Sequence, residues 1–585
     1  MFLYLTFYVI HVYININNIN NEDIKMKAKN ILALVATCIG IFICMLDTTV
    51  MNIALPAIQT NLHTSLNNLQ WSINAYMIVF ASLTIPLGKL AERFGLSRFY
   101  LFGLVLFLAG SLISAFSGNL STLLIGRIIQ AMGAATIFPL SMILGISTTS
   151  VEKRTGVIAA LGMTQGLAAA VGPTIGGVLT QFLSWRWIFL VNLPLILLMT
   201  ILCVLSFDFR QPIKRVKVDF VGALLSIIAL FALTLALVQG REWSWHSPVI
   251  IGLFILSIVA LIIFIMVERK LAEPMIPLQL FRSRQFNGAS LVLILSNLFL
   301  IGVTVVLPTY FTKIQGKEEL MAAILVTPIT AMIFVMSPIA AILINKLGAR
   351  LMIATGFLAM AGGYLLFATI SMTNYIQVLS TCALLGAGYG IIAGPIVVLA
   401  ASDFTGEMLT ASQSVAGVLR EVGMVLGVAI FVTGLYSNVN LAKSQSISDA
   451  KAQIQKLNIP TKAKNTMTQE VVSQIKAEKT QGNNRKNFIS KSERHQIIQE
   501  NFTKALVSHP ELPDDAQQKI LQLVTIKVDY KIRNTNQQIN QASIKIRENT
   551  KNKFTKAFTS LYVLALPFVI LSGLTAILFN KKTVK

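Results

Sequence analysis

Long apolar stretches recur along most of this chain, and they constrain its fold more than any other feature. Each is about 20 residues long, which lets a helix cross a bilayer core of about 30 Å. Of the 585 residues, 55% are hydrophobic and only 12% are charged, whereas soluble domains carry about 25% charged residues. The stretches do not alternate polar and apolar residues as the strands of membrane barrels do. The sequence therefore predicts an all-α polytopic membrane protein.

Hydropathy predicts fourteen spans, each placed to within about 2–4 residues. They cover 31–53, 71–90, 98–118, 121–146, 155–182, 187–207, 219–239, 248–267, 287–309, 320–344, 350–371, 376–400, 411–436 and 557–580. Loops rich in Lys and Arg alternate with loops that are poor in them, and the basic loops of membrane proteins are cytoplasmic. The basic loops carry Lys89, Arg93, Arg98, Lys153, Arg154, Arg210, Lys214, Arg215, Lys217, Arg269, Lys270, Arg282, Arg284, Lys346 and Arg350. We expect both termini in the cytoplasm and the chain in the plasma or inner membrane.

One long polar segment, 437–556, interrupts this pattern and is net basic. It follows the thirteenth span, so we expect it outside the cell. This fits the charge rule, because loops longer than about 60 residues are translocated largely regardless of charge. The part from Asp514 to Phe554 contains few helix breakers and is expected to be helical, continuing the last span outward. A disordered loop is the alternative.

The two ends of the chain are short segments outside the spans. Residues 1–30 begin with an apolar and aromatic stretch, but lack the positive charge and the cleavage site of a signal peptide. Met26 is followed by Lys27, Lys29 and the first span, so we expect Met26 to be the true start. Residues 581–585 form a basic tail that the orientation places in the cytoplasm.

Several functions are disfavoured by the sequence. A nucleotide-binding loop of the G-x-x-x-x-G-K-[ST] type is missing, which disfavours ATP-driven pumping by this chain alone. Cys38, Cys44, Cys203 and Cys382 lie in apolar stretches without metal-ligand spacing. The formal net charge of +23 is explained by cytoplasmic loops, and there is no basic soluble fold that would bind nucleic acid. We expect no enzyme activity, no cofactor and no metal.

Two charged residues are predicted inside the bilayer, Asp47 in the first span and Arg127 in the fourth. An intramembrane charge costs several kcal/mol unless it is paired, hydrated or neutralised. Because removal from water disfavours the charged form of a carboxyl group, such a group can bind and release a proton. Arg127 shares a helical face with Gln130. We interpret Asp47 as a proton or cation site with Arg127 as its partner; purely structural bonds to nearby backbone are the alternative.

A second charged pair, Arg420 and Glu421, lies inside the thirteenth span before Gly423 and Gly427. We expect an internal ion pair, with a second proton site at Glu421 as the alternative.

The predicted cytoplasmic turn from Gly88 to Arg98 combines glycines with charges. Gly88 and Gly95 suit tight backbone geometry, and Glu92 and Arg93 can make charge-assisted bonds to helix ends. We interpret this turn as a conformational latch; an ordinary basic loop is the alternative.

Small residues lie on one side of the fifth span and end in Gly172, Pro173, Gly176 and Gly177. Small residues let membrane helices approach closely, and proline bends a helix at a fixed place. The alternative is ordinary helix packing. Side chains facing a central cavity would receive a lipophilic ligand, and the candidates are Trp71, Tyr76, Gln130, Phe138 and Phe299.

Together these residues resemble the 14-span drug:proton antiporter branch of the major facilitator superfamily, the EmrB/QacA type. The resemblance covers residues 30–436 and 557–580. Its segments are Asp47 to Pro56; Gly88 to Arg98, with Glu92 where Asp is usual; Arg127 to Gly133, with Ala131 replacing a glycine; Gly172 to Gly177, the antiporter motif; and Trp185 to Pro194.

The resemblance implies two six-helix bundles with two extra helices between them. The N-terminal bundle would cover 31–207, the linking helices 208–270, and the C-terminal bundle 287–436 and 557–580, with 437–556 as a large extracellular loop. It also implies alternating access, and export of a small lipophilic compound in exchange for protons, with Asp47 and Arg127 serving the coupling. In two-membrane cells a periplasmic adaptor would be a further partner.

Other functions stay open at this point. A dedicated exporter of one metabolite, peptide, lipid or siderophore would use the same scaffold. An importer using proton symport is disfavoured by the Gly172 to Gly177 motif. A membrane sensor or scaffold that transports nothing is the alternative from another class, with 437–556 as its partner-binding region. Some relatives carry an acid in the tenth span that attracts cationic drugs, and residues 320–344 contain none.

Overall fold

The computed structural model describes residues 22–149, 154–210, 219–271, 273–404, 406–459, 461–476, 491–507 and 513–579. Within these ranges the chain forms helices and turns but no strands, which confirms the all-α prediction. The predicted tail 581–585 and most of the N-terminal segment lie outside the described residues. Met26 is described and lies in the first helix, which begins at Glu22.

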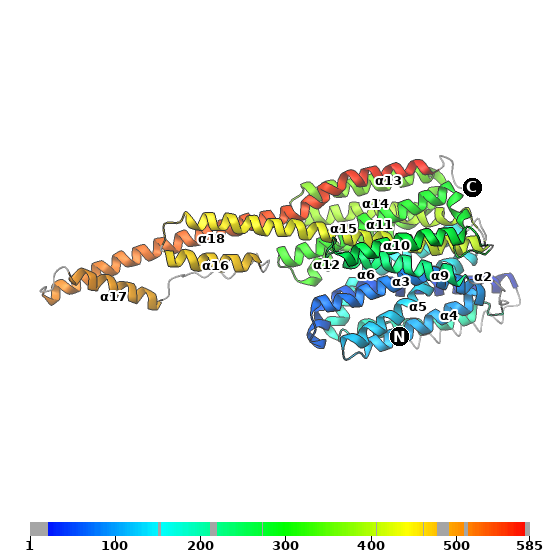
Figure 1. Ribbon diagram of the computed structural model, residues 1–585, viewed down its shortest axis with the longest axis horizontal. Helices are drawn as coiled ribbons and strands as arrows, with labels where there is room; N and C mark the ends of the chain where they lie inside the picture. Colours follow the sequence, from blue (N-terminus) through cyan, green and yellow to red (C-terminus); the bar gives the residue numbers. More distant parts are fainter. Residues whose placement is uncertain are drawn as a thin grey trace. The chain divides into compact units, whose positions relative to one another are not determined.

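The helices of the first half, drawn from blue to green in Figure 1, follow one another along the chain. They are α2 (Glu22–Leu62), α3 (Leu66–Phe94), α4 (Leu96–Ala115), α5 (Leu120–Ser147), α6 (Arg154–Phe182), the single turn α7 (Trp187–Leu190), α8 (Asn192–Ser206), α9 (Phe220–Gln239) and α10 (Pro248–Glu268).

The second half contains longer helices. They are the 3-10 turn η2 (Leu278–Arg282), α11 (Arg284–Thr309), the π-helical turn η3 (Tyr310–Ile314), α12 (Glu319–Leu347), α13 (Ala349–Thr369), α14 (Tyr375–Ala401), α15 (Gly406–Gln455), α16 (Thr461–Lys476), α17 (Lys491–Val507), α18 (Asp514–Ser572) and the 3-10 turn η4 (Gly573–Leu578). The polar stretch from Asp514 and the last apolar stretch therefore belong to one helix, α18.

Thirteen helices in the described residues are long and apolar enough to cross a membrane. They match thirteen of the fourteen predicted spans, with α7 and α8 together forming one of them. The remaining prediction, 155–182, falls on α6, whose apolar stretch Gly156–Ala168 is shorter than a full span. The whole helix is 29 residues long, and its crossing of the membrane stays a prediction.

Polar caps and glycines set the helix ends. Ser65, Asn119, Asp219, Ser247 and Asn374 each accept a hydrogen bond from a backbone amide in the first turn of the helix that follows, as N-cap residues do. Gly95 and Gly348 have φ of 95° and 80°, a region that side chains disfavour. Each lets the chain pass directly from one span into the next.

The helices α4 and α5 approach so closely that their backbones touch. A Cβ on Gly133 of α5 would lie 2.5 Å from the backbone nitrogen of Phe107 on α4. Likewise, a Cβ on Gly110 of α4 would overlap the backbone nitrogen of Gln130. Small residues allow this contact between membrane helices. The contact positions Gln130 deep in the first half, against α4.

The helix α6 lies between the two halves of the chain. It packs against α2 of the first half and against α12 and α14 of the second. The helices α9 and α10 pack against each other, and α9 also packs against α3. Leu237 of α9 joins Val425 and Ala429 of α15 in a small apolar cluster.

Contacts divide the chain into two compact units. The first comprises residues 1–308, 319–433 and 562–585, and it includes all the helices described above that surround α6. The second comprises 309–318 and 434–561, and so includes the predicted polar segment 437–556. Inside the second unit, Arg494 of α17 donates to Asp529 of α18 through Nε and Nη2, at 2.6 and 2.8 Å, and Lys553 of α18 pairs with Asp449 of α15.

We predict that Gly133→Val abolishes stable folding. The added methyl groups meet backbone atoms of α4, which cannot move aside as a flexible side chain would, and overpacking of this kind costs about 1–3 kcal/mol or more. Gly252→Val on α10 is the matched control, because nothing lies within 4 Å of its Cβ position. Size-exclusion profiles and thermal unfolding of the purified variants in detergent measure the effect. Equal behaviour of the two variants would contradict the packing argument.

Candidate functional site

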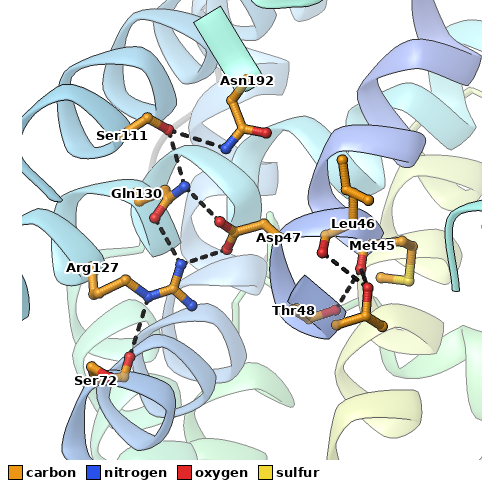
Figure 2. A network of polar contacts seen from close by, with 10 residues as sticks. Met45, Leu46, Asp47, Thr48, Ser72, Ser111, Arg127, Gln130 and Asn192 are labelled. Atoms are coloured by element: carbon orange, nitrogen blue, oxygen red, sulfur yellow. Dashed lines mark hydrogen bonds and ion pairs between the residues drawn. The ribbon is translucent and has the colours of Figure 1, made fainter. Parts of the chain in front are cut away.

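A buried ion pair joins Asp47 of α2 to Arg127 of α5 (Figure 2). Nη1 of Arg127 lies 2.6 Å from Oδ2 of Asp47, and it also donates to Oε1 of Gln130 at 2.8 Å. Nε2 of Gln130 donates to Oδ1 of Asp47 at 2.8 Å. The three residues are exposed by 4%, 1% and 0% respectively. The structure thus brings the two predicted intramembrane charges into direct contact, and Gln130 links them a second time.

Three more helices support this triad through residues that the sequence did not single out for the site. Ser111 of α4 accepts from Nε2 of Gln130 at 3.0 Å, and Asn192 of α8 donates to the same hydroxyl at 3.5 Å. Nε of Arg127 donates to the backbone carbonyl of Ser72 on α3 at 3.3 Å. Five helices therefore meet at one polar cluster, seen in Figure 2. In the sequence, Ser111 is recognisable only as a polar residue inside an apolar span. That position does not reveal which residue it contacts.

Aromatic rings enclose the guanidinium group of Arg127. Its central carbon lies 4.3 Å from the ring centroid of Tyr76 and 5.9 Å from that of Phe189. Cation–π attraction is strongest where water is excluded, and both rings are almost fully buried. Tyr76, a predicted ligand contact, is therefore part of the wall of the ion pair.

This arrangement makes each charge of the pair depend on the other. Two buried charges keep their place only if each is paired and hydrogen bonded, and loss of one partner leaves the other uncompensated. Protonation of Asp47 removes its charge, and with it most of its attraction for Arg127. The packing of α2 against α5 therefore depends on both charges of the pair.

The next turn of α2 forms the contact with the predicted antiporter motif on α6. A Cβ on Gly172 would overlap Oγ1 of Thr49 and lie 2.9 Å from its Cβ, and one on Gly176 would lie 3.0 Å from Cγ1 of Val50. The hydroxyl of Thr49 donates back to the carbonyls of Met45 and Leu46 on its own helix. The close contact thus begins two residues after Asp47. Pro173 lies within α6 at the same level of the helix.

Other glycines of α6 face the second half of the chain. A Cβ on Gly166 would lie 3.1 Å from the backbone of Phe334 on α12, and one on Gly162 would lie 3.2 Å from Oγ of Ser337. A Cβ on Gly177 would lie 3.7 Å from Leu320. The helix α6 is therefore in close contact with α2 on one side and with α12 on another.

The second predicted pair, Arg420 and Glu421 of α15, forms an ion pair of 2.9 Å between Nη2 and Oε1. Nη1 of Arg420 donates to Oε1 of Gln165 on α6 at 3.0 Å. The guanidinium carbon lies 4.1 Å from the ring centroid of Phe138 on α5. A residue of the second half thus contacts two helices of the first, and Gln165 is a contact that the sequence analysis missed.

The two charged pairs belong to one electrostatic neighbourhood. Tyr76 interacts with the charges of Asp47, Arg127 and Glu421, and Cys44 interacts with those of Asp47 and Arg420. On the side of the second half, Tyr389 of α14 interacts with Arg420 and Glu421 and donates to Oδ1 of Asn297 at 2.9 Å.

The predicted latch, Gly88 to Arg98, connects α3 with α15. A Cβ on Gly88 would lie 2.7 Å from Oγ of Ser414 on α15. Lys89 and Glu92 form an ion pair of 3.0 Å within α3, and both are nearly buried. The guanidinium of Arg93 lies 5.6 Å from the ring of Phe94, and Nε of Arg98 donates to the carbonyl of Phe209 at 2.8 Å.

The predicted ligand contacts are not gathered in one place. Trp71 is half-buried, and its ring centroid lies 6.2 Å from that of Trp243 in the α9–α10 turn. Phe138 is buried beside Phe80 and Arg420, and Gln130 is committed to the ion pair. Phe299 is buried in the second half, where Tyr364 packs on its ring and donates to its carbonyl at 2.6 Å. Within the described ranges, no cluster of three His, Cys, Asp or Glu side chains is suited to a metal ion.

Comparison with known proteins places this arrangement in a family. The family model of the Major Facilitator Superfamily matches residues 37–428, which is most of the chain and includes both charged pairs. The protein belongs to the major facilitator superfamily. Members of this superfamily are transporters, so the chain is a multi-pass membrane transporter that acts on small substrates. The match ends before the polar segment 437–556.

Named relatives in this superfamily include drug resistance proteins. The chain is 30% identical to the multidrug transporter protein MdtP of Bacillus subtilis over 407 residues, covering 69% of this chain and 75% of the relative. It is 31% identical to the methylenomycin A resistance protein of Streptomyces coelicolor over 427 residues, covering 71% and 87%. It is 27% identical to the multidrug resistance protein Stp of Mycobacterium tuberculosis over 408 residues, covering 69% and 76%.

We predict that Asp47→Asn and Arg127→Gln each destabilise the protein by about 3 kcal/mol, because each leaves a buried charge without its partner. The double variant is expected to lose less stability than the two single variants combined, with a coupling energy of about 0.5–3 kcal/mol. Thermal unfolding in detergent measures the cycle. Glu242→Gln, at a partly exposed 3.9 Å pair with Arg241, serves as the control. Additive single effects would show that the two residues act independently.

Proposed function

We propose that this transporter is a proton-coupled exporter of lipophilic compounds that works by alternating access. The observation that carries the proposal is the position of the Asp47–Arg127 pair. The pair is buried and joins α2 to α5, and Asp47 lies next to the close contact between α2 and α6. Because α6 contacts both α2 and α12, a single helix separates Asp47 from the second half of the chain.

The proposed coupling follows from the charge of one carboxyl group. Proton entry to Asp47 weakens its attraction for Arg127 and favours the conformation that returns the emptied carrier. Release of the proton restores the ion pair and the conformation with substrate affinity. Proton and substrate then favour different states of the same site, and such linkage is reciprocal.

Glu421 is the proposed second participant. Its partner Arg420 contacts Gln165 of α6 and Phe138 of α5, so neutralising Glu421 would free a charge that joins the two halves. We assign Asp47 the main coupling role because its carboxyl group accepts hydrogen bonds from both Arg127 and Gln130, whereas that of Glu421 accepts one from Arg420 alone in the described structure.

The proposed substrates are lipophilic compounds, since relatives such as MdtP and Stp are named as multidrug transport or resistance proteins. A dedicated exporter is the second candidate. Two relatives are named for resistance to a single compound, methylenomycin A. A panel of structurally unrelated compounds separates the two, because a dedicated exporter transports one class only.

The proposed location is the plasma or inner membrane with both termini in the cytoplasm. This orientation places residues 437–556 outside the cell and the Lys89–Glu92 turn inside. In a two-membrane cell, a periplasmic adaptor is the partner that would extend export across the outer membrane.

We predict that reconstituted protein transports ethidium, a lipophilic cation, when a proton gradient is imposed across the vesicle membrane. Asp47→Asn should lose gradient-driven transport by at least about tenfold, because the amide cannot exchange a proton at physiological pH. It should retain substrate exchange without a gradient, since that process needs no net proton movement. Fluorescence of ethidium bound to enclosed DNA reports the flux.

Glu242→Gln is the control, as it removes a carboxylate outside the site. Gradient-driven transport that persists in Asp47→Asn would move the coupling to Glu421, to be checked with Glu421→Gln. If the native protein transports no member of a broad compound panel, the exporter proposal is wrong and the sensor alternative gains support.

The proposed orientation is tested by cysteine labelling. We predict that a membrane-impermeant maleimide labels Lys451→Cys in intact cells but leaves Lys270→Cys unlabelled until the membrane is opened. Both positions are exposed in the structure, so accessibility depends on the side of the membrane alone. The native chain, with its four cysteines, gives the background signal. The reverse labelling pattern would invert the topology.

A further inference from the structure

The two extra helices, α9 and α10, bring a pair of carboxyl groups together where α9 begins and α10 ends, away from the turn that joins them. Asp219 precedes α9, and its Oδ1 accepts from the backbone amide of Val221 at 3.1 Å. Glu268 is the last residue of α10, and its Oε2 accepts from the amide of Ile276 at 3.2 Å. Each carboxyl group is therefore fixed by one oxygen, and neither can turn away without losing a backbone bond.

The other two oxygens face one small space. A Cβ on Gly222 would overlap Oδ2 of Asp219 and lie 2.7 Å from Oε1 of Glu268, so both atoms border the same point. Both are buried, and neither has a hydrogen-bond partner in the described part of the chain. Glu268 as a whole is only 2% exposed. A buried acceptor without a partner is costly, and two adjacent carboxyl groups cannot both stay ionised at low cost.

The nearby charges do not neutralise this pair. Lys89 of α3 acts electrostatically on Glu268, but its ammonium group is already 3.0 Å from Glu92 of the same helix. Arg269 and Lys270 follow Glu268 in sequence, and both residues are exposed. The pair, with the Lys89–Glu92 couple beside it, therefore carries surplus negative charge in a buried place.

We propose that Asp219 and Glu268 share one proton between Oδ2 and Oε1, forming a proton-binding site separate from the Asp47 pair. One shared proton supplies the missing donor to both oxygens and removes one of the two charges. A bound metal ion is the weaker explanation, because Ca²⁺ takes 6–8 oxygen ligands and Mg²⁺ takes six in near-octahedral geometry, whereas two free oxygens face this space.

The shared proton connects the extra helices to the predicted latch. When it is bound, the pair presents one negative charge to Lys89, and Lys89 stays with Glu92. When it leaves, the second negative charge competes with Glu92 for Lys89. The protonation state of the Asp219–Glu268 pair thus acts on the end of α3, which contacts Ser414 of α15 through Gly88.

The first test is thermal stability against pH in detergent, over about pH 5 to about pH 9, where an isolated carboxyl group in water is ionised. The folded protein holds a proton that the unfolded chain releases, so stability falls as pH rises. We expect the native midpoint to drop by several degrees. Asp219→Asn and Glu268→Gln should each flatten this slope, because an amide N–H replaces the shared proton permanently.

Glu242→Gln is the matched control and should keep the native slope, since it removes a carboxylate elsewhere. If Glu268→Gln does not fold, the slope of Asp219→Asn is the deciding measurement. This variant should fold, because the amide oxygen of Asn can still cap α9. Native slopes in Asp219→Asn or in both variants would overturn the proposal. A midpoint that changes at constant pH and ionic strength when Na⁺, K⁺, Mg²⁺ or Ca²⁺ is exchanged would also overturn it in favour of a metal ion. A midpoint independent of the cation supports the proton.

Discussion

The structure of the first half depends on the ion pair between Asp47 and Arg127. Inside a membrane protein, neither charge is tolerable alone, so each fixes the position of the helix that carries the other. A series of hydrogen bonds runs from Asp47 through Gln130 and Ser111 to Asn192. These bonds hold α4 and α8 against the ion pair. The glycine contacts between α4 and α5 explain how these helices come close enough for this network. They let Nε2 of Gln130 reach both Asp47 of α2 and Ser111 of α4.

The same pair lies next to the contact that links the two halves. The tight packing of Thr49 and Val50 against Gly172 and Gly176 leaves little room for α2 to move independently of α6. Packed interfaces of this kind change between discrete arrangements and do not deform smoothly. Because Gly166 of α6 also lies close to the backbone of Phe334 on α12, a shift of α2 caused by loss of the ion pair must be accommodated at the boundary between the halves.

The sequence predicted the helical fold, thirteen of the spans and the residues of the ion pair, for one physical reason. Charges and long apolar runs are costly to misplace in a membrane, so they leave few structural choices. Ser111 and Gln165 were not predictable, because an uncharged polar side chain in a span can be satisfied by its own helix. Phe299, a predicted ligand contact, is packed against Tyr364, and its role in ligand binding stays a prediction. An aromatic residue gives the same sequence signal in a core and in a cavity.

The carboxyl pair of Asp219 and Glu268 is a second contact that the sequence alone could not predict. In sequence, Asp219 is an ordinary helix cap and Glu268 is one charge in a basic loop; only the packing of α9 against α10 makes them neighbours. Gly222 keeps the space between them open, since any side chain there would collide with both groups. Helix stability does not explain Gly222, because glycine weakens a helix by about 1 kcal/mol relative to alanine; the space that it leaves for the two acids does. The space is better explained by the proton that the two acids need in order to stay buried together.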